Sequence, residues 1–306
     1  AYADEGVELR KAGISLPILV MSPDEENMDS ILKHDLEPEI YSFSILNALE
    51  YSIKKSIHPK NKPIRIHIKL DTGMNRLGFE EKEIDALVKR IRMNDLLHPQ
   101  SIFSHLAGSD ESEFEDFTRE QFDKFCYMAS QVEKSCDHQP IRHILNSAGI
   151  SKFPEYQMGM VRLGLGLYGL PPFKEEESKL KNINKLKTSI TQIKSISKGH
   201  SVGYNRAFIA ERDMKTATVA IGYADGIARY LGNGKFGMKV NGTFCPIIGN
   251  VCMDMCMLDV TDIDCQEGDE VIVFDSQAEI KKMAELGQTI PYEILTGISQ
   301  RVKRVY

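Results

Sequence analysis

The sequence predicts an α/β barrel followed by a mostly β domain, and three observations support this fold class. From residue 1 to about residue 170, short apolar strands alternate with amphipathic helical stretches, which is typical of parallel βαβ units. One of these strands carries cationic side chains along one face. After residue 182 the pattern changes to closely spaced strand-like segments with Gly, Asn and Asp at the turns. We therefore expect two domains, residues 1–180 and residues 181–306.

The first domain is predicted to alternate six strands with helices. An open doubly wound sheet and a closed barrel both satisfy this rhythm. No GxGxxG motif opens a helix after the first strand, so the dinucleotide-binding form of the open sheet has no support. Helical stretches are expected at residues 80–97 and 113–135. The predicted strands span residues 17–21, 39–43, 64–70, 101–106, 141–146 and 160–168.

The strand at residues 64–70 favours the barrel. Arg65, His67 and Lys69 share one of its faces, while isoleucines and a leucine occupy the other. Both faces of a parallel sheet are usually buried, so three cations on one face are costly unless that face lines a polar, ligand-filled interior. An edge strand with one face in water is the alternative.

The second domain is predicted to be mostly β. Its strand-like segments are short and are separated by turn residues, and one last helical stretch is expected at residues 292–298. The predicted strands span residues 186–195, 217–221, 238–240, 243–248, 255–260 and 270–274.

Composition excludes several classes of protein. With 42% hydrophobic and 27% charged residues, the 306-residue chain is globular rather than disordered. Its net charge of -6 argues against nucleic-acid binding, and no run of about 18 apolar residues is present to span a membrane. The six cysteines include no CxxC pair, so we expect no metal site and a reduced, cytoplasmic setting.

The loops that follow two predicted strands of the first domain carry candidate chemistry. In a barrel, the loops after the strands build the active site. DTGMNRLGF, residues 71–79, places Arg76 between two glycines, and SHLAGSDE, residues 104–111, places His105 at a strand end. A solvated arginine and a core or surface histidine are the alternatives.

Two later segments predict an anion site. HILNSAG supplies Asn146 and Ser147, and VRLGLGLYG supplies Arg162 with three glycines. Backbone amides, a hydroxyl and a cation on adjacent barrel strands suit a phosphate group. Tight packing is the alternative explanation for the glycines.

In the second domain, GYNRAF, AIGYADG and GNVCMDM are glycine-anchored loops that carry Tyr204, Tyr223 and Cys252. The two tyrosines alone could be ordinary sheet aromatics. Cys252 cannot be classified as inert or reactive without its exposure.

Taken in order, eight segments resemble the signature segments of bacterial alanine racemase. The resemblance covers the chain from about Glu5 to Tyr306 and implies a homodimer with shared active sites that uses pyridoxal 5'-phosphate to interconvert L-alanine and D-alanine for peptidoglycan synthesis. It also implies a (β/α)8 TIM-type barrel, here lacking its first strand, followed by a mostly β C-terminal domain. The segments are IHIKLDTGMNRLGF, SHLAGSDE, HILNSAG, MVRLGLGLYG, VGYNRAF, AIGYADG, GNVCMDM and ISQRVKR.

The resemblance implies roles for the catalytic residues. Tyr204 would remove the proton from L-alanine in the partner subunit's site, with His105 as its helper. Arg162 would hydrogen-bond the pyridine nitrogen, which then stays unprotonated because a guanidinium keeps its proton. Arg76 would hold the substrate carboxylate and approach the cofactor's phenolic oxygen. Lys69 matches a lysine that is carbamylated in several relatives.

The resemblance also implies binding residues. Ser147 and the backbone amides of Gly164 and Leu165 would bind the cofactor phosphate, helped by Asn146, and the backbone of Met253 would help to bind substrate. Residues that match the substrate entrance are Tyr223, Asp110, Arg229 and Gln300, the last standing where many relatives have a tyrosine.

One departure affects the expected activity. The family's Schiff-base lysine lies in a motif of the form KANAYGHG on the first barrel strand, and no lysine of this sequence stands in such a motif. The chain begins at Ala1 without a methionine or a signal peptide, so we expect a fragment of a longer polypeptide, a simple racemase or a fusion, that is nearly inactive alone.

Other functions remain open at this point. A racemase of broader specificity, or one for serine or lysine, would use the same scaffold. A related decarboxylase is disfavoured because the resemblance places Arg162, rather than an acidic residue, opposite the pyridine nitrogen. A non-catalytic domain that binds pyridoxal phosphate is a third alternative.

Overall fold

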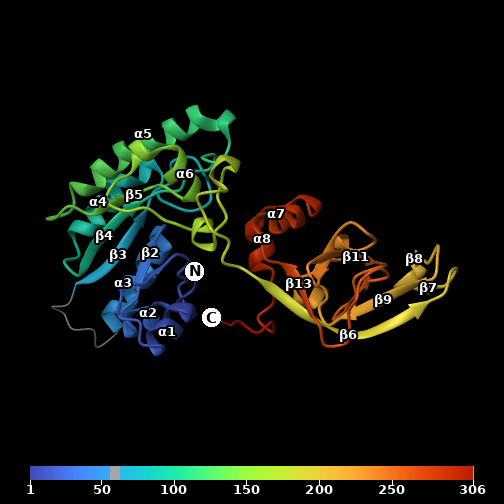
Figure 1. Cartoon of the computed structure of the whole chain (residues 1–306). Helices are drawn as coiled ribbons and strands as arrows, with labels where there is room; N and C mark the ends of the chain where they lie inside the picture. The colour runs from blue at the N-terminus through green and yellow to red at the C-terminus, as the bar shows by residue number, and fades with distance from the viewer. Residues whose placement is uncertain (56–62, 306) are drawn as a thin grey trace. The chain divides into compact units, whose positions relative to one another are not determined.

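The computed structural model of the chain describes residues 1–55 and 63–305. The chain forms two compact units, Ala1–Gly164 and Leu165–Tyr306 (Figure 1). Buried apolar residues make a separate core within each unit. Each unit therefore has its own architecture.

Five parallel strands form the sheet of the first unit, and they pair in chain order. They are β1 (Leu19–Val20), β2 (Glu37–Ile40), β3 (Ile64–Lys69), β4 (Leu97–Phe103) and β5 (Ile141–His143). Sequential order with a helix between neighbouring strands is the arrangement of successive strands in a βα barrel. Because β3 pairs with both β2 and β4, the alternative of an edge strand is wrong.

Helices cover one face of this sheet (Figure 1). In α4, apolar residues recur at Ile84, Leu87 and Ile91, which places them on one buried stripe. This stripe packs in the same core as Ile66 and Ile68 of β3. The helices of the unit are α1 (Ala3–Lys11), α2 (Met28–Lys33), α3 (Phe43–Lys55), α4 (Ile84–Arg92), α5 (Glu115–Glu133) and α6 (Ser147–Lys152).

The opposite face of the sheet is polar and buried. His67 and Lys69 are each only 5% exposed, although their neighbours in sequence face the helices. Both side chains meet acidic or hydroxyl groups from adjacent strands. The predicted polar interior is therefore present, whereas Arg65, at the start of the strand, stays partly exposed.

The predicted strand at residues 160–168 is wrong. This segment has no strand residues and ends in a short 3-10 helix, Leu165–Tyr168. A backbone hydrogen bond from Arg162 N to Leu145 O, at 2.9 Å, joins it to the residues that directly follow β5. The glycines at alternate positions remove the side chains that would otherwise favour an extended strand.

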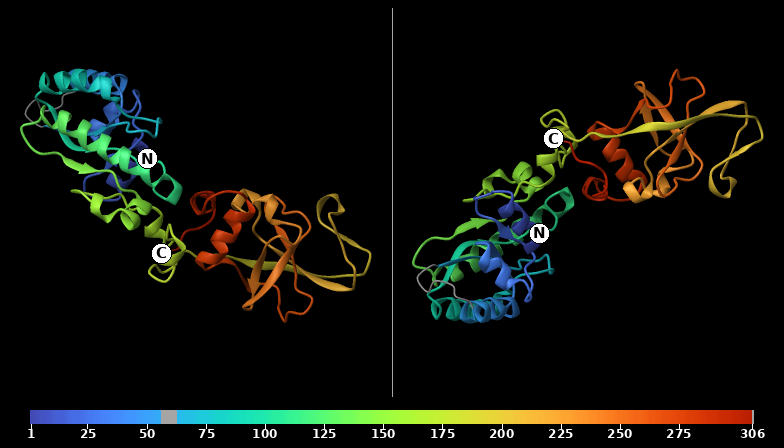
Figure 2. Two further views of the ribbon diagram at one scale, coloured as in Figure 1. Left: turned by 90° about the horizontal axis from the view of Figure 1, so that it is seen from above. Right: turned by 90° about the horizontal axis from the view of Figure 1, so that it is seen from below.

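Six antiparallel strands close into a barrel in the second unit, in the order β10-β11-β12-β9-β6-β13. The long strand β6 leads toward a two-stranded hairpin of β7 (Ser201–Val202) and β8 (Phe208–Ile209) (Figure 2). The barrel strands are β6 (Leu186–Ile196), β9 (Met214–Val219), β10 (Gly237–Val240), β11 (Thr243–Ile248), β12 (Cys256–Asp259) and β13 (Glu270–Phe274).

Two helices follow the barrel strands. The last, α8 (Pro291–Thr296), was expected, whereas α7 (Gln277–Leu286) was not. Ser276 and Glu279 form a capping box, in which the Glu279 amide donates to the Ser276 hydroxyl and the Ser276 amide donates to the Glu279 carboxylate. This Ser-x-x-Glu pattern was a readable helix start.

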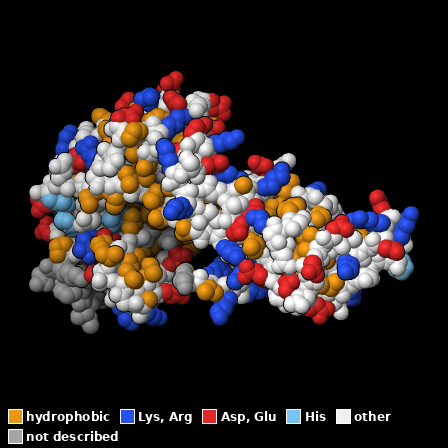
Figure 3. All heavy atoms as spheres, viewed as in Figure 1, with side chains coloured by type: hydrophobic (Ala, Val, Ile, Leu, Met, Phe, Trp, Pro, Cys, Tyr) orange, Lys and Arg blue, Asp and Glu red, His pale blue; other side chains and the backbone are white. Residues whose placement is uncertain are grey.

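Charged side chains of both signs are interspersed on the face of the molecule drawn in Figure 3. This mixture agrees with the modest net charge of -6. Within residues 1–55 and 63–305, no helix is long and apolar enough to cross a membrane.

Candidate active site

The loop after β3 is a tight turn that presents Arg76. Oδ1 of Asp71 accepts hydrogen bonds from the amides of Gly73 and Asn75, both at 3.0 Å. Gly78 has a φ of 128°, and a Cβ there would lie 2.7 Å from the Asp71 nitrogen, so only glycine fits. Arg76 is exposed between these fixed points. A rigid loop thus holds a guanidinium beyond the C-terminal end of β3.

A buried ion pair lies at the end of β3. Nζ of Lys69 is 3.7 Å from Oε1 of Glu39 on β2 and 4.5 Å from the ring centre of Phe103 on β4. Burial lowers the pKa of Lys69, and burial raises the pKa of Glu39 to about 7 despite the nearby charges of Lys69 and Arg162. Sequence reasoning singled out Lys69 but missed Glu39.

Three residues supply acceptors that hold the guanidinium of Arg162. Its Nη1 donates to Nδ1 of His143 at 2.5 Å, and its Nη2 donates to the carbonyl oxygens of Ser104 at 2.6 Å and Ile144 at 3.1 Å. No acceptor lies against its Nε among the residues that the structure describes. The guanidinium is therefore fixed in place with one donor still free.

His105 lies beside this guanidinium. Its Nδ1 is 3.3 Å from Nη2 of Arg162, and its carbonyl accepts a hydrogen bond from Gln121 at 3.2 Å. Burial lowers the pKa of His105 to about 4, and the charges of Arg162, Lys69 and Arg76 add to this effect. The ring is therefore neutral at physiological pH.

The HILNSAG and VRLGLGLYG segments lie against each other. The Ser147 hydroxyl accepts a hydrogen bond from the Gly164 amide at 2.9 Å. Oδ1 of Asn146 accepts from the Gly149 amide and the Ser109 hydroxyl, each at 2.9 Å, so its side-chain oxygen is fully used locally. Ser147 and Gly164 are thus close enough to share one anion, and Asn146 fixes the turn that carries them.

In the second unit, the tyrosine loop after β7 is strained and exposed. Tyr204 is 68% exposed, and its carbonyl accepts a hydrogen bond from Nδ2 of Asn250 at 3.1 Å. Asn205 and Arg206 both have positive φ, which side chains rarely adopt. A turn held in this way presents the Tyr204 phenol outward rather than into the sheet, so the expectation of an ordinary sheet aromatic is wrong for Tyr204.

The loops that carry Tyr223 and Met253 are joined by backbone hydrogen bonds. The amides of Tyr223 and Ala224 donate to the carbonyls of Cys252 and Met253, each at 3.0 Å. A Cβ on Gly222 would lie 2.4 Å from both carbonyl oxygens, so this close approach requires glycine. The two loops therefore form one surface.

Arg301 links this surface to the end of the chain. Its guanidinium donates to Asp225 and to Asp254, both at 2.7 Å. This pairing places the exposed Gln300 next to the joined loops. Arg229 is also exposed in this unit, and its charge acts on Cys252, whose pKa is raised by burial.

The structure thus gathers the predicted residues into two sets, one in each unit. Lys69, Arg76, His105 and Arg162 share one electrostatic environment, with Ser147 and Gly164 on the adjoining segments. Asp110 is exposed and lies one residue beyond the buried Ser109. Tyr204, Tyr223, Met253 and Gln300 lie on connected loops of the second unit.

Sequence reasoning missed several residues of these sets. The Tyr292 hydroxyl accepts a hydrogen bond from the Leu165 amide at 3.2 Å. No local sequence pattern predicts this bond, because the two residues lie far apart in sequence. Glu37 and Glu39 were readable signals, since two carboxylates at alternate positions of a buried strand need cationic or donor partners.

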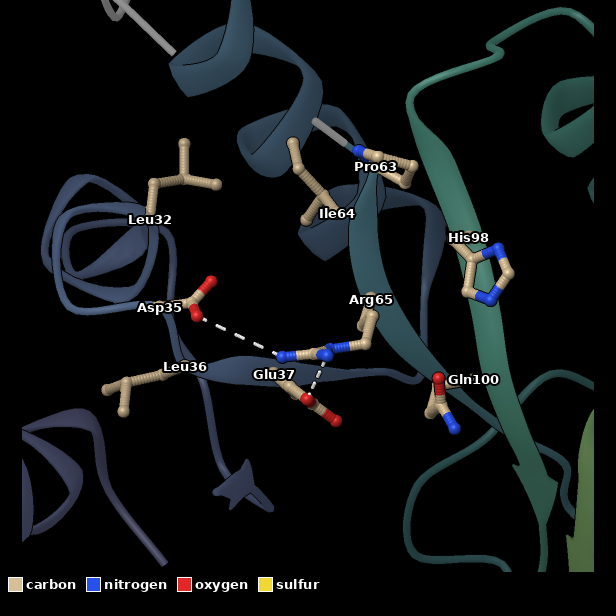
Figure 4. Close-up of a pocket in the computed structure, with 9 residues that line it drawn as sticks. All are labelled: Leu32, Asp35, Leu36, Glu37, Pro63, Ile64, Arg65, His98 and Gln100. Atoms are coloured by element: carbon tan, nitrogen blue, oxygen red, sulfur yellow. Dashed lines mark ion pairs between the residues drawn. The ribbon is translucent and has the colours of Figure 1, made fainter. Parts of the chain in front are cut away.

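A cavity of about 360 Å³ lies at the opposite, N-terminal ends of β2, β3 and β4. Arg65 crosses it and pairs with Glu37 and Asp35 (Figure 4). None of the residues predicted for the active site lines it. Among the described residues, no group of histidine, cysteine and acidic side chains is arranged to hold a metal ion.

Two family models match the chain. One, described as the N-terminal domain of alanine racemase, matches residues 1–172, and the other, described as its C-terminal domain, matches residues 183–306. The chain is 38% identical to alanine racemase 1 of Clostridium acetobutylicum over 100% of its own length and 80% of that protein.

Solved structures are also similar. The alanine racemase of Clostridium difficile 630 matches with 31% identity and a TM-score of 0.91, over 100% of this chain and 80% of that one. The Bacillus anthracis enzyme with bound L-Ala-P matches with 31% identity and a TM-score of 0.86, over 99% and 78%. The Bartonella henselae enzyme with covalently bound pyridoxal phosphate matches with 29% identity and a TM-score of 0.85, over 99% and 82%. The predicted fold class, a barrel domain followed by a mostly β domain, is confirmed by these likenesses.

Proposed function

The chain belongs to the alanine racemase family, and from this we propose that it provides the barrel and C-terminal domains of an enzyme that interconverts L-alanine and D-alanine. The observation that supports the proposal best is the Nε donor of the half-buried Arg162, which has no acceptor among the described residues while both Nη atoms are engaged. The pathway we propose is peptidoglycan synthesis, in the cytoplasm.

The family depends on pyridoxal 5'-phosphate, and the residues of the first unit fit this cofactor. When bound, it supplies an electron sink for the charge that develops at the α-carbon. Nε of Arg162 would donate to the pyridine nitrogen and keep it unprotonated. The Ser147 hydroxyl and the amides of Gly164 and Leu165 would bind the phosphate, on a turn that Asn146 holds in place.

Tyr204 and His105 would move and stabilise the proton. The exposed phenol of Tyr204, presented by a strained turn, suits a base that acts in the partner subunit's site. His105, neutral beside Arg162, would help to set the acidity of that phenol. This sharing of sites is the reason for proposing a homodimer.

Arg76 and Met253 would position the substrate. The exposed guanidinium of Arg76 has a geometry suited to a carboxylate, and the Met253 backbone stands on the surface shared with Tyr223. Lys69, in carbamylated or free form, would tune Arg76 electrostatically. We place the substrate entrance at Tyr223, Arg229, Asp110 and Gln300. We also propose that residues 1–180 form the cofactor-binding domain and that residues 181–306 form the β-rich second domain.

A racemase of broader specificity is the second candidate, because Gln300 stands in the segment ISQRVKR where many relatives have a tyrosine. An amide is smaller than a phenol and would leave a wider entrance. A panel of L-alanine, L-serine and L-lysine distinguishes the two: alanine preferred by at least tenfold in kcat/KM supports the first candidate, and comparable values support the second.

The test is made on the full-length gene product. We expect racemisation of L-alanine that depends on added pyridoxal phosphate. Borohydride reduction followed by peptide mapping should label a lysine in a motif of the form KANAYGHG, a motif in which no lysine of this sequence stands. Specific label on one of the lysines of this sequence, together with activity, would refute the site assignment.

A further inference from the structure

A line of hydrogen bonds crosses the polar interior of the first unit and ends at Arg162. Oε2 of Glu37 is 2.9 Å from Nε2 of His67, and Nδ1 of His67 is 2.6 Å from Oγ of Ser101. Oγ of Ser101 is 2.9 Å from Nε2 of His143, whose Nδ1 meets Arg162 at 2.5 Å. We call these five residues the polar line.

The polar line joins four strands and two ends of the sheet. Glu37 opens β2 at the N-terminal cavity, where its other oxygen pairs with Arg65 at 2.5 Å (Figure 4). His67, Ser101 and His143 lie on β3, β4 and β5, and each is at most 5% exposed. Water therefore does not substitute for these bonds, so each group must find its partner within the line.

The observed contact between Arg162 and His143 is compatible with only one tautomer of His143. A guanidinium only donates, so Nδ1 of His143 must accept and carry no proton. The neutral His143 ring then has its proton on Nε2 and donates it to the Ser101 hydroxyl. Burial and the charge of Arg162 lower the pKa of His143 to about 2, which agrees with a neutral ring.

The contact at the other end is compatible with the same direction. A carboxylate only accepts, so Nε2 of His67 donates to Glu37. The Ser101 hydroxyl accepts from His143 and donates its own proton onward to Nδ1 of His67. With the proton of each ring on Nε2, donors and acceptors alternate without conflict from Arg162 to Glu37.

We propose that Glu37 acts through this polar line as a positioning residue, which holds His143 in the one tautomer that can accept from Arg162 and so keeps Arg162 aimed with its Nε donor free. If the line ran in reverse, Nδ1 of His143 would carry a proton that faces an Nη1 proton of Arg162. The consequence for catalysis rests on the proposed function of Arg162 at the cofactor; the tautomers themselves do not.

The direct test is nitrogen NMR on protein labelled with 15N-histidine, since long-range proton–nitrogen correlations report which ring nitrogen holds the proton. We expect His67 and His143 to be neutral with the proton on Nε2. A proton on Nδ1 of His143, or a charged His143, would overturn the proposal. This measurement needs neither substrate nor turnover.

Two pairs of variants test the polar line itself. Ser101→Ala removes the acceptor of His143, so we expect mixed tautomers of His143. The control Ser52→Ala, at a buried serine of α3 outside the polar line, should leave the tautomer of His143 unchanged. Glu37→Gln keeps the shape but adds donors, so we expect mixed tautomers of His67. Arg65→Gln removes only the partner on the cavity side and should keep the tautomers. Unchanged tautomers in Ser101→Ala and Glu37→Gln would also overturn the proposal.

The catalytic consequence is measured on the full-length enzyme. We expect Glu37→Gln and Ser101→Ala to lower kcat by about 10- to 100-fold, the usual effect of removing a group that orients a functional residue, with KM for alanine little changed. An unchanged kcat in both variants would refute the positioning role. Correct tautomers in a protein that racemises nothing would instead refute the proposed function and leave the polar line intact.

Discussion

Nζ of Lys69 lies 3.7 Å from Oε1 of Glu39, and the two residues are 5% and 1% exposed. Oε1 of Glu39 has no hydrogen-bond partner among the described residues, so this oxygen depends on the charge of Lys69. Burial of a carboxylate without full hydrogen bonding costs free energy unless the group takes up a proton. The pair is therefore poised between a charged and a neutral state, and stability should depend on pH.

We expect Glu39→Gln to remove part of this pH dependence. The pKa of Glu39 is raised from 4.5 to about 7, chiefly by burial, so its stabilising contribution is full below pH 4.5 and is lost as pH rises through 7. The free energy of unfolding of the unsubstituted protein should fall relative to that of the variant by on the order of 3 kcal/mol between pH 4.5 and pH 8. Urea titrations at several pH values measure the free energy of unfolding of both proteins. If it changed with pH in the same way in both, the raised pKa of Glu39 would be contradicted.

Removing the cation alone should be worse than removing both charges. Lys69→Met leaves the Glu39 carboxylate buried without its partner, and we expect a loss of about 3 kcal/mol in unfolding free energy at pH 8. The double variant Lys69→Met/Glu39→Gln should recover most of that loss, because it leaves no unpaired charge. A double-mutant cycle by urea unfolding measures the coupling, and additive losses would argue against a direct interaction.

The sequence predicted the strands of both units better than it predicted the segment at residues 160–168. Strand β3 was readable because isoleucines and cations alternate along it. The segment at residues 160–168 showed a similar alternation, but Gly164 and Gly166 stand at two of its positions, and none of its residues belongs to a strand of the described structure. Periodicity reports which face a side chain takes, not whether a neighbouring strand is present to pair.

The candidate site was predictable where a loop follows a strand directly. His105 was identified in that way and Arg162 from the glycine-rich segment that carries it, and the structure brings them within 3.3 Å of each other. His143 was missed, and so was Glu39 although a carboxylate on a buried strand was itself a signal, because the partners of both residues lie on other segments. Long-range pairing of this kind is set by sheet register, which a single sequence does not encode locally.

His105 should show no titration near neutrality. Its pKa is lowered to about 4, first by burial and then by the charges of Arg162 and Lys69. A depressed histidine contributes stability that is present above its ordinary pKa of 6.5 and is lost as pH falls through 4. We expect His105→Gln to be less sensitive to acid in this range. Nitrogen NMR of the His105 ring checks the pKa, and a midpoint near 6.5 would be contrary to this account.

Asn146 and Ser147 should separate stability from phosphate binding. Oδ1 of Asn146 accepts from Gly149 and Ser109, so Asn146→Ala should cost about 1 to 2 kcal/mol of unfolding free energy. Ser147→Ala removes only the acceptor of the Gly164 amide, so we expect a smaller loss of stability but weaker binding of pyridoxal phosphate, by about tenfold. Urea unfolding and a fluorescence titration measure the two effects. If both variants lost the same stability and bound pyridoxal phosphate as tightly as the unsubstituted protein, the proposed phosphate site would be excluded.

Tyr204→Phe should abolish racemisation while leaving the fold intact. The phenol is 68% exposed and only the backbone of Tyr204 is held, by Asn250, so the change in unfolding free energy should stay within about 0.5 kcal/mol. Loss of a positioned acid–base group lowers rates by about 10²- to 10⁴-fold. In deuterated water, incorporation of deuterium into L-alanine should fall by the same factor, because the proposed function assigns to this phenol the removal of the proton from that isomer. Tyr127→Phe, at an exposed tyrosine of α5, is the matched control and should keep full activity. Retention of more than a tenth of the racemase activity in Tyr204→Phe would mean that another group is the base for L-alanine.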